Sequence, residues 1–132
     1  MAIDHLTVPV RSYEVSKRFY ESALRPLGLV VLLDWPDNNR AYFGVPHEPS
    51  FLWLVESWAA GSLDVTLMAT APEAVEAFHA AAVAAGARSD WEPAVRPDQS
   101  RDYYSARVLD PDGNSVEAVY RGAAASDEPV AA

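Results

Sequence analysis

The hydrophobic pattern of the chain changes its period several times, and each change marks a predicted element. The alternating segment Ile3–Val10 predicts a strand. Ser12 then precedes a segment with apolar residues at near-helical spacing, which predicts a capped helix ended by Pro26 and Gly28. Three short apolar stretches rich in β-branched and aromatic residues follow and predict strands at Leu29–Asp34, Arg40–Val45 and Phe51–Glu56. The first half therefore has the order βαβββ.

The same order returns after Gly61. Leu63–Ala69 predicts a strand, and Thr70-Ala71-Pro72-Glu73 has the pattern of a capping box that opens a helix ending at Gly86. A short strand is expected near Trp91 within Ala87–Val95. The last two predicted strands, Tyr103–Leu109 and Ser115–Tyr120, are joined by Asp-Pro-Asp-Gly-Asn, a sequence typical of a tight hairpin.

The two halves also match residue by residue, because His5-Leu6-Thr7-Val8 superposes on Asp64-Val65-Thr66-Leu67. This repeat predicts an α+β fold of two tandem βαβββ modules, about 1–60 and 61–121, forming a curved mixed sheet around a central cleft. At 132 residues the chain is expected to be one domain. The tail 122–132 is rich in Ala and lacks an apolar pattern, so it is expected to be disordered.

Composition narrows the possible partners. A formal net charge of −9 disfavours nucleic acid and anionic membranes. The longest apolar run, Leu27–Leu33, is too short to cross a bilayer, which favours a cytoplasmic protein. The chain has no cysteine, so disulfides, thiolate zinc sites and cysteine nucleophiles are excluded. Any catalysis must use histidine, carboxylates, hydroxyls or a metal.

Glu117 is the most informative candidate because it lies within an apolar strand. A buried carboxylate there needs a positive partner, either a metal ion or an arginine. A three-residue turn at 111–113 places Arg107 directly across from Glu117, whereas a four-residue turn places Val108 there. The sequence is compatible with either a metal ion or an Arg107–Glu117 ion pair at this position.

Three segments together resemble the vicinal oxygen chelate superfamily, which includes glyoxalase I, extradiol dioxygenases and the bleomycin-resistance proteins. The matching segments are Ile3–Val10, Ser16-Lys17-Arg18-Phe19-Tyr20-Glu21 running to Leu27-Gly28, and Val108-Leu109-Asp110-Pro111-Asp112-Gly113-Asn114 running to Glu117-Ala118-Val119. The resemblance implies metal ligands on the first and last strand of each half, where His5 and Glu117 match. Two positions depart from that pattern: Asp64 stands where many relatives carry histidine, and Trp53 stands near the place of a carboxylate.

The resemblance implies two alternative functions. In the first, a divalent ion (Mn, Fe, Ni, Zn or Mg) held by His5, Asp64 and Glu117 serves a lyase or dioxygenase of the glyoxalase type, with Glu117 as catalytic base. In the second, no metal is present and the cleft sequesters an aromatic or cationic small molecule. Trp53, Arg107 and Tyr104 are the expected ligand contacts. A scaffold that has lost both activities is a third possibility, and relatedness also implies a homodimer.

Overall fold

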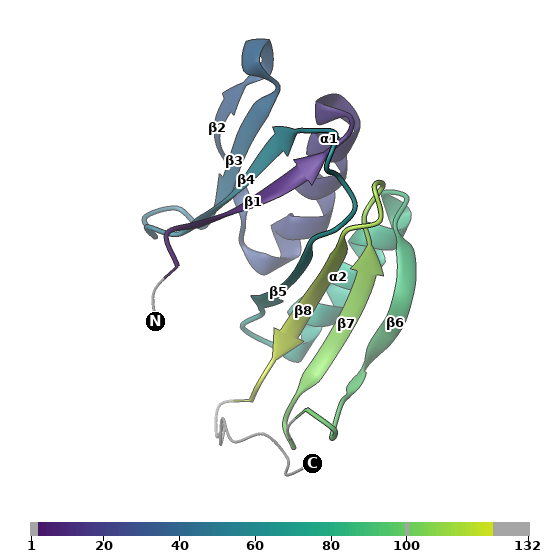
Figure 1. Ribbon diagram of the computed structural model, residues 1–132. Helices are drawn as coiled ribbons and strands as arrows, with labels where there is room; N and C mark the ends of the chain where they lie inside the picture. Colours follow the sequence, from purple (N-terminus) through teal and green to yellow (C-terminus); the bar gives the residue numbers. More distant parts are fainter. Residues whose placement is uncertain (1–2, 100, 123–132) are drawn as a thin grey trace.

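The computed structural model describes residues 3–99 and 101–122, and it confirms the twofold βαβββ order and the α+β class (Figure 1). In chain order the elements are β1 (His5–Val10), α1 (Tyr13–Leu24), β2 (Val30–Trp35), β3 (Arg40–Gly44), β4 (Phe51–Glu56), β5 (Asp64–Met68), α2 (Pro72–Ala84), β6 (Arg88–Val95), β7 (Tyr104–Leu109) and β8 (Ser115–Tyr120). Short 3-10 turns lie at Arg25–Leu27 and Pro36–Asn38. Apart from Gly122, the tail expected to be disordered lies outside the described residues.

The strands form two four-stranded mixed sheets with the same internal order. The first sheet runs β1-β4-β3-β2 and the second runs β5-β8-β7-β6. In each sheet the first and last strands of the module pair in parallel, and the remaining pairs are antiparallel. The predicted duplication is therefore present in topology, although the sheet is divided into two rather than continuous.

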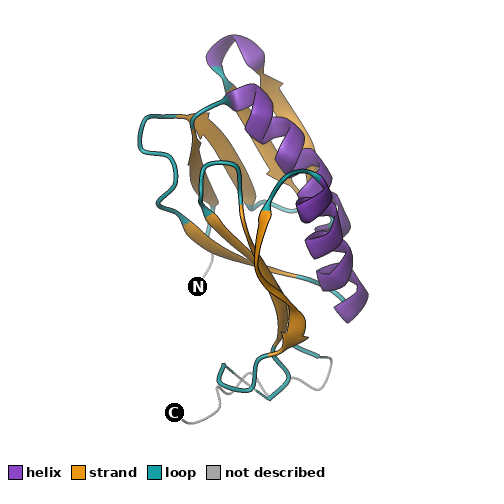
Figure 2. Cartoon of the chain, turned by 90° about the vertical axis from the view of Figure 1, so that its right-hand side faces the viewer, coloured by secondary structure: helices purple, strands orange, loops and turns teal. Residues whose placement is uncertain are grey.

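Both helices lie along one side of the molecule and the strands along the other (Figure 2). Alternate strand residues such as Val8, Leu54 and Val108 are fully buried and join a core with Tyr20 of α1 and Phe78 of α2. Because side chains alternate across a strand, the residues between these core positions face away from the helices. Each sheet thus has one covered face and one open face. No helix in the described ranges is long and apolar enough to cross a membrane.

The two helices begin differently. Ser12 caps α1 as predicted, since its Oγ accepts a hydrogen bond from the Val15 N–H at 3.3 Å. The capping box predicted at Thr70 is wrong, because α2 begins after Ala71 and no side chain caps it. Pro72 explains the difference: at the first helical position its ring fixes φ and it has no N–H that needs a partner.

The turn between β7 and β8 connects the two modules through Asn114, which is fully buried. Its Oδ1 accepts hydrogen bonds from the N–H groups of Gly61 and Leu63, at 3.1 and 3.0 Å. Its Nδ2 donates to the Pro9 carbonyl at 3.1 Å and to Asp110 at 2.9 Å. One side chain therefore holds the last turn, the linker between the modules and the first strand together.

Asp110 extends the same network into α1. The Tyr20 hydroxyl donates to Asp110 Oδ2 at 2.6 Å, and the N–H groups of Asp112 and Asn114 donate to Asp110 Oδ1. Burial, followed by the charge of Asp110, raises the pKa of Tyr20 well above its usual value, so the phenol remains a donor. The acidic turn residue Asp110 is consequently satisfied within the fold.

Candidate functional site

The open faces of the two sheets carry different chemistry at equivalent positions. In the first sheet Trp53 lies between Thr7 and Tyr42. In the second sheet Glu117 lies between Thr66 and Arg107. The duplicated register therefore places an indole in one module where the other has a carboxylate, and a phenol where the other has a guanidinium.

We call the first of these surfaces the aromatic face, formed by His5, Trp35, Tyr42, Phe51 and Trp53. The Tyr42 ring lies 4.5 Å from Trp53 and 4.5 Å from Phe51, measured between ring centroids. Trp35 contacts Tyr42 edge-on at 5.2 Å, and the His5 imidazole stacks on Phe51 at 5.1 Å. These rings are only partly buried, so they present π surface to a ligand.

Trp53 is central to the aromatic face. Its Nε1 is buried and has no hydrogen-bond partner among the residues described. The Arg40 guanidinium lies 5.4 Å from the indole centroid, within the range of a cation–π contact. This ring thus already accepts one cation.

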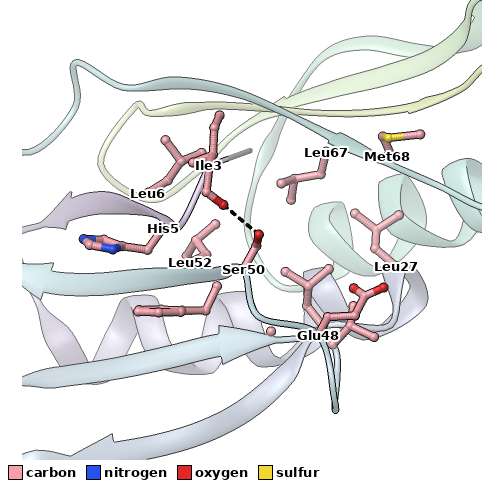
Figure 3. Close-up of a pocket in the computed structure, with 13 residues that line it drawn as sticks. Ile3, His5, Leu6, Leu27, Glu48, Ser50, Leu52, Leu67 and Met68 are labelled. Carbon is pink, nitrogen blue, oxygen red and sulfur yellow. Dashed lines mark hydrogen bonds between the residues drawn. The ribbon is translucent and has the colours of Figure 1, made fainter. Parts of the chain in front are cut away.

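A pocket of about 470 Å³ adjoins the aromatic face between the two modules (Figure 3). His5 and Phe51 belong to both surfaces, while Leu67 and Met68 of β5 contribute from the second module. Most of the remaining side chains are aliphatic: Ile3, Leu6, Leu27, Leu29, Val45 and Leu52. The cleft between modules is therefore mainly apolar, with Glu48 as its carboxylate.

His5 has a carboxylate beside one ring nitrogen. Its Nδ1 lies 2.8 Å from Asp4 Oδ1. When Nδ1 carries the proton for this contact, Nε2 has a free lone pair. Both side chains are substantially exposed, so solvent screens the pair.

Glu117 lies on the open face of the second sheet and is buried. It accepts a hydrogen bond from the Tyr103 hydroxyl at 2.8 Å and a longer one from Thr66 Oγ1 at 3.4 Å. Burial, together with this hydrogen bond, raises the pKa of Tyr103 to about 12. Tyr103 is accordingly protonated at neutral pH and donates to the carboxylate.

Arg107 has the register predicted for a three-residue turn, directly across from Glu117. Its ion pairs within the described residues nevertheless run to Asp64 at 3.5 Å and Asp90 at 3.2 Å. The proposed Arg107–Glu117 pair is not among them. Tyr103 and Thr66 bond the carboxylate, while the guanidinium is shared by two aspartates.

The structure separates the residues expected to bind a metal. His5 lines the pocket between the modules, whereas Asp64 and Glu117 line a second pocket on the other sheet. Within residues 3–99 and 101–122, no three His, Asp or Glu side chains gather closely enough to hold a metal ion. Asp64 is moreover paired with Arg107. The donors that the structure describes in a single chain therefore do not fit a metal centre.

The expected ligand contacts also divide. Trp53 lies on the aromatic face, and Arg107 lines the second pocket. Tyr104 points to the helix-covered face of the sheet, opposite to its neighbour Ser105. Its hydroxyl donates there to Glu76 of α2 at 2.7 Å. Its neighbour Tyr103 instead reaches Glu117. The position of Phe51 on the aromatic face was not predicted from the sequence. The spacing of two residues between Phe51 and Trp53 on one strand indicates that the two side chains share a face.

Comparisons with known proteins agree with this architecture. A family model described as Glyoxalase/Bleomycin resistance protein/Dioxygenase superfamily matches residues 2–118. A solved glyoxalase/bleomycin resistance protein from Albidiferax ferrireducens T118 is 28% identical, with a TM-score of 0.75, covering 91% of this chain and 98% of that one. The antibiotic binding protein TnmS3 from a Streptomyces species is 25% identical, with a TM-score of 0.66 and coverages of 91% and 95%.

A lactoylglutathione lyase from Agrobacterium tumefaciens is similar in fold, at 19% identity and a TM-score of 0.67, covering 90% of this chain and 92% of that one. A search among curated proteins finds no match. The solved structures with this fold thus include a protein named for binding and a protein named for catalysis.

Proposed function

The chain belongs to the glyoxalase/bleomycin resistance protein/dioxygenase superfamily, and we propose that it binds a planar aromatic small molecule, preferably a cation, without needing a metal ion. The observation that carries this proposal is the place of Trp53. It occupies in the first module the position that Glu117 occupies in the second, and it packs with other rings on an open face. An aromatic side chain there supports stacking rather than metal ligation.

The geometry of the rings supports binding of a flat ligand. Tyr42 and Trp53 meet at an interplanar angle of 61°, and Phe51 is tilted by 34° to each of them. Their partly exposed surfaces form an angled set rather than a closed stack, so a flat molecule can stack on one ring and meet a neighbouring ring edge-on. Covering these rings removes apolar area from water, which is the main driving force for such binding.

A preference for cations follows from charge. The formal net charge of −9 raises the local concentration of cations around the protein. The face of an indole also attracts cations, and a ligand cation would take the part of the ring that Arg40 leaves uncovered. Similarity to a protein named as antibiotic binding adds support for a binding role in this chain.

Fluorescence titration tests the proposal. Adding the planar cation ethidium should quench tryptophan emission with micromolar affinity, equally with and without EDTA. Trp53→Ala should weaken ethidium binding by about tenfold, the scale of one lost stacking contact. Trp58→Ala is the matched control, because Trp58 is 95% exposed in the linker between the modules and should leave affinity unchanged. Loss of binding in EDTA, or equal affinity in the Trp53→Ala variant, would contradict the proposal.

The second candidate is a metal-dependent lyase or dioxygenase, and the Asp4–His5 contact favours it. A carboxylate on the far ring nitrogen is the common arrangement of a metal-binding histidine. Since His5 and Glu117 lie on different sheets, this candidate requires a homodimer in which His5 of one copy meets Glu117 of the other. Glu117 would then accept the substrate proton.

Metal analysis and oligomeric state decide between the candidates. Protein replenished with Mn²⁺, Fe²⁺, Ni²⁺ or Zn²⁺ and then dialysed should retain one ion per chain if the second candidate holds. His5→Ala and Glu117→Gln should each abolish that retention. A monomer in sedimentation experiments, or sub-stoichiometric metal in every case, rejects the metal-dependent candidate.

A further inference from the structure

Trp91 of β6 lies between two arginine side chains on the open face of the second sheet. The guanidinium carbon of Arg96 is 4.0 Å from the indole centroid, and that of Arg107 is 5.0 Å away. The indole Nε1 donates to Ser105 Oγ at 3.2 Å, which fixes the ring. Trp91 and the two arginines border a pocket of about 290 Å³, also lined by Asp64, Thr66, Asp98, Gln99, Tyr103 and Glu117.

The two guanidinium groups differ in their partners. Arg107 is neutralised by Asp64 and Asp90. Arg96 has no ion pair with a carboxylate in the ranges that the structure describes. Its buried Nε, like that of Arg107, has no hydrogen-bond partner there. The absence of a pair is informative because the chain has 19 acidic residues against 10 Lys and Arg.

The stacking on Trp91 leaves Arg96 able to bind a ligand. A guanidinium that contacts an aromatic ring uses its flat face, whereas its N–H donors point outward in its own plane. That edge matches the two oxygens of a carboxylate, which accept parallel hydrogen bonds from such a fork. Arg96 therefore has a planar donor edge that no residue in the described ranges fills.

We propose that this pocket binds the carboxylate of a small organic acid, with Arg96 as its principal ligand and Trp91 as the surface that orients Arg96. The site lies on the second sheet and does not depend on the aromatic face. Asp98 and Glu117 in the same lining favour a monoanion, because their repulsion of a phosphate dianion is about twice as large. A carboxylate in this lining can also accept a hydrogen bond from a hydroxyl group on the same acid.

Chemical-shift titration of the full chain with benzoate tests this site. Benzoate should bind in the millimolar range and shift the Trp91 indole N–H resonance, whereas the neutral amide benzamide should not. Phenyl phosphate should bind more weakly than benzoate. Arg96→Gln should weaken benzoate binding by about tenfold or more, and Arg96→Lys should give an intermediate loss because charge remains without the planar fork.

Arg88→Gln supplies the control, since Arg88 lies at the opposite end of β6 from Arg96, which follows that strand, and it is exposed and has no ion pair in the described part of the chain. It should change benzoate affinity less than twofold. The proposal is overturned if benzoate does not bind at 20 mM, which is roughly the weak limit for so small a ligand. It is also overturned if benzamide or phenyl phosphate binds as tightly as benzoate, or if Arg96→Gln retains full affinity for benzoate. Ethidium binding to the aromatic face should be unchanged in Arg96→Gln, which separates failure of this site from failure of the proposed function.

Discussion

Trp53 and Glu117 occupy the same position in the two modules of this fold. Each lies on the last strand of its module and pairs with the third residue of the first strand, Thr7 for Trp53 and Thr66 for Glu117. The equivalence shows how one duplicated framework presents two different surfaces. One is suited to stacking on rings, and the other to hydrogen bonding and charge.

Asn114→Ala should destabilise the protein strongly, because it leaves the part-buried N–H groups of Gly61 and Leu63 without their acceptor. An unsatisfied buried group costs about 1–3 kcal/mol, and two part-buried donors lie toward the lower end, so we expect a loss of about 2–3 kcal/mol in the free energy of unfolding. Urea denaturation measures it. Asn38→Ala, in an exposed turn, should change stability by less than about 0.5 kcal/mol. Similar losses in the two variants would show that the Asn114 network contributes little.

Tyr20→Phe and Tyr104→Phe form a matched pair that measures how burial changes the contribution of a tyrosine–carboxylate hydrogen bond to stability. Both phenols donate to a carboxylate, at 2.6 Å to Asp110 and 2.7 Å to Glu76, but only the first bond is buried. Thermal or urea unfolding should show a loss of about 1–2 kcal/mol for Tyr20→Phe. Tyr104→Phe should cost less than about 0.5 kcal/mol, since water replaces the exposed bond. Equal costs would contradict this account of the module junction.

Tyr103 should make stability fall in strongly alkaline solution. Its pKa of about 12 in the folded protein lies above the usual 10 of an unfolded chain. The stabilisation is therefore complete below pH 10 and is lost as the pH rises from about 10 to 12. The difference in unfolding free energy between wild type and Tyr103→Phe should be constant up to pH 10 and shrink above it.

Glu117→Gln provides the corresponding control for Tyr103. Absorbance of the phenolate near 295 nm should show that one tyrosine loses its proton at a lower pH in this variant than in the wild type. The shift should be partial, because burial is the larger cause of the raised pKa and remains in the variant. An unchanged titration would show that the hydrogen bond to Glu117 does not raise the pKa of Tyr103.

Gly61→Ala should be much more damaging than Gly86→Ala, although both glycines have positive φ, 98° and 108°. A Cβ at position 61 would lie 2.6 Å from the Asp112 carbonyl oxygen, while a Cβ at position 86 has nothing within 4 Å. We expect a loss of about 1 kcal/mol at position 86 from backbone strain alone. At position 61 the loss should be about 2–4 kcal/mol. Comparable unfolding midpoints would refute the close approach of the linker to the last turn.

Sequence patterns predicted the order of elements because periodicity and turn chemistry are local properties. Ser12 caps α1 as expected, and Asp-Pro-Asp-Gly-Asn joins the last two strands as expected. Of the two registers that the sequence left open, the structure has Arg107 opposite Glu117. The start of α2 was misplaced because Pro72 made a side-chain cap unnecessary. Register does not decide ion pairing, since a long guanidinium can reach other strands, as Arg107 does to Asp64 and Asp90.

Local patterns in the chain are thus enough to predict the duplicated α+β framework and the strands on which His5, Trp53 and Glu117 lie. Which of these side chains share a pocket depends on tertiary packing. That packing assigned His5 to an apolar pocket between modules, and it placed Glu117 with Tyr103 in a polar pocket on the other sheet. The physical reason is that alternation along a strand sets only the direction of a side chain. The distance between two sheets depends instead on how helices and linkers pack, here through Tyr20, Asp110 and Asn114.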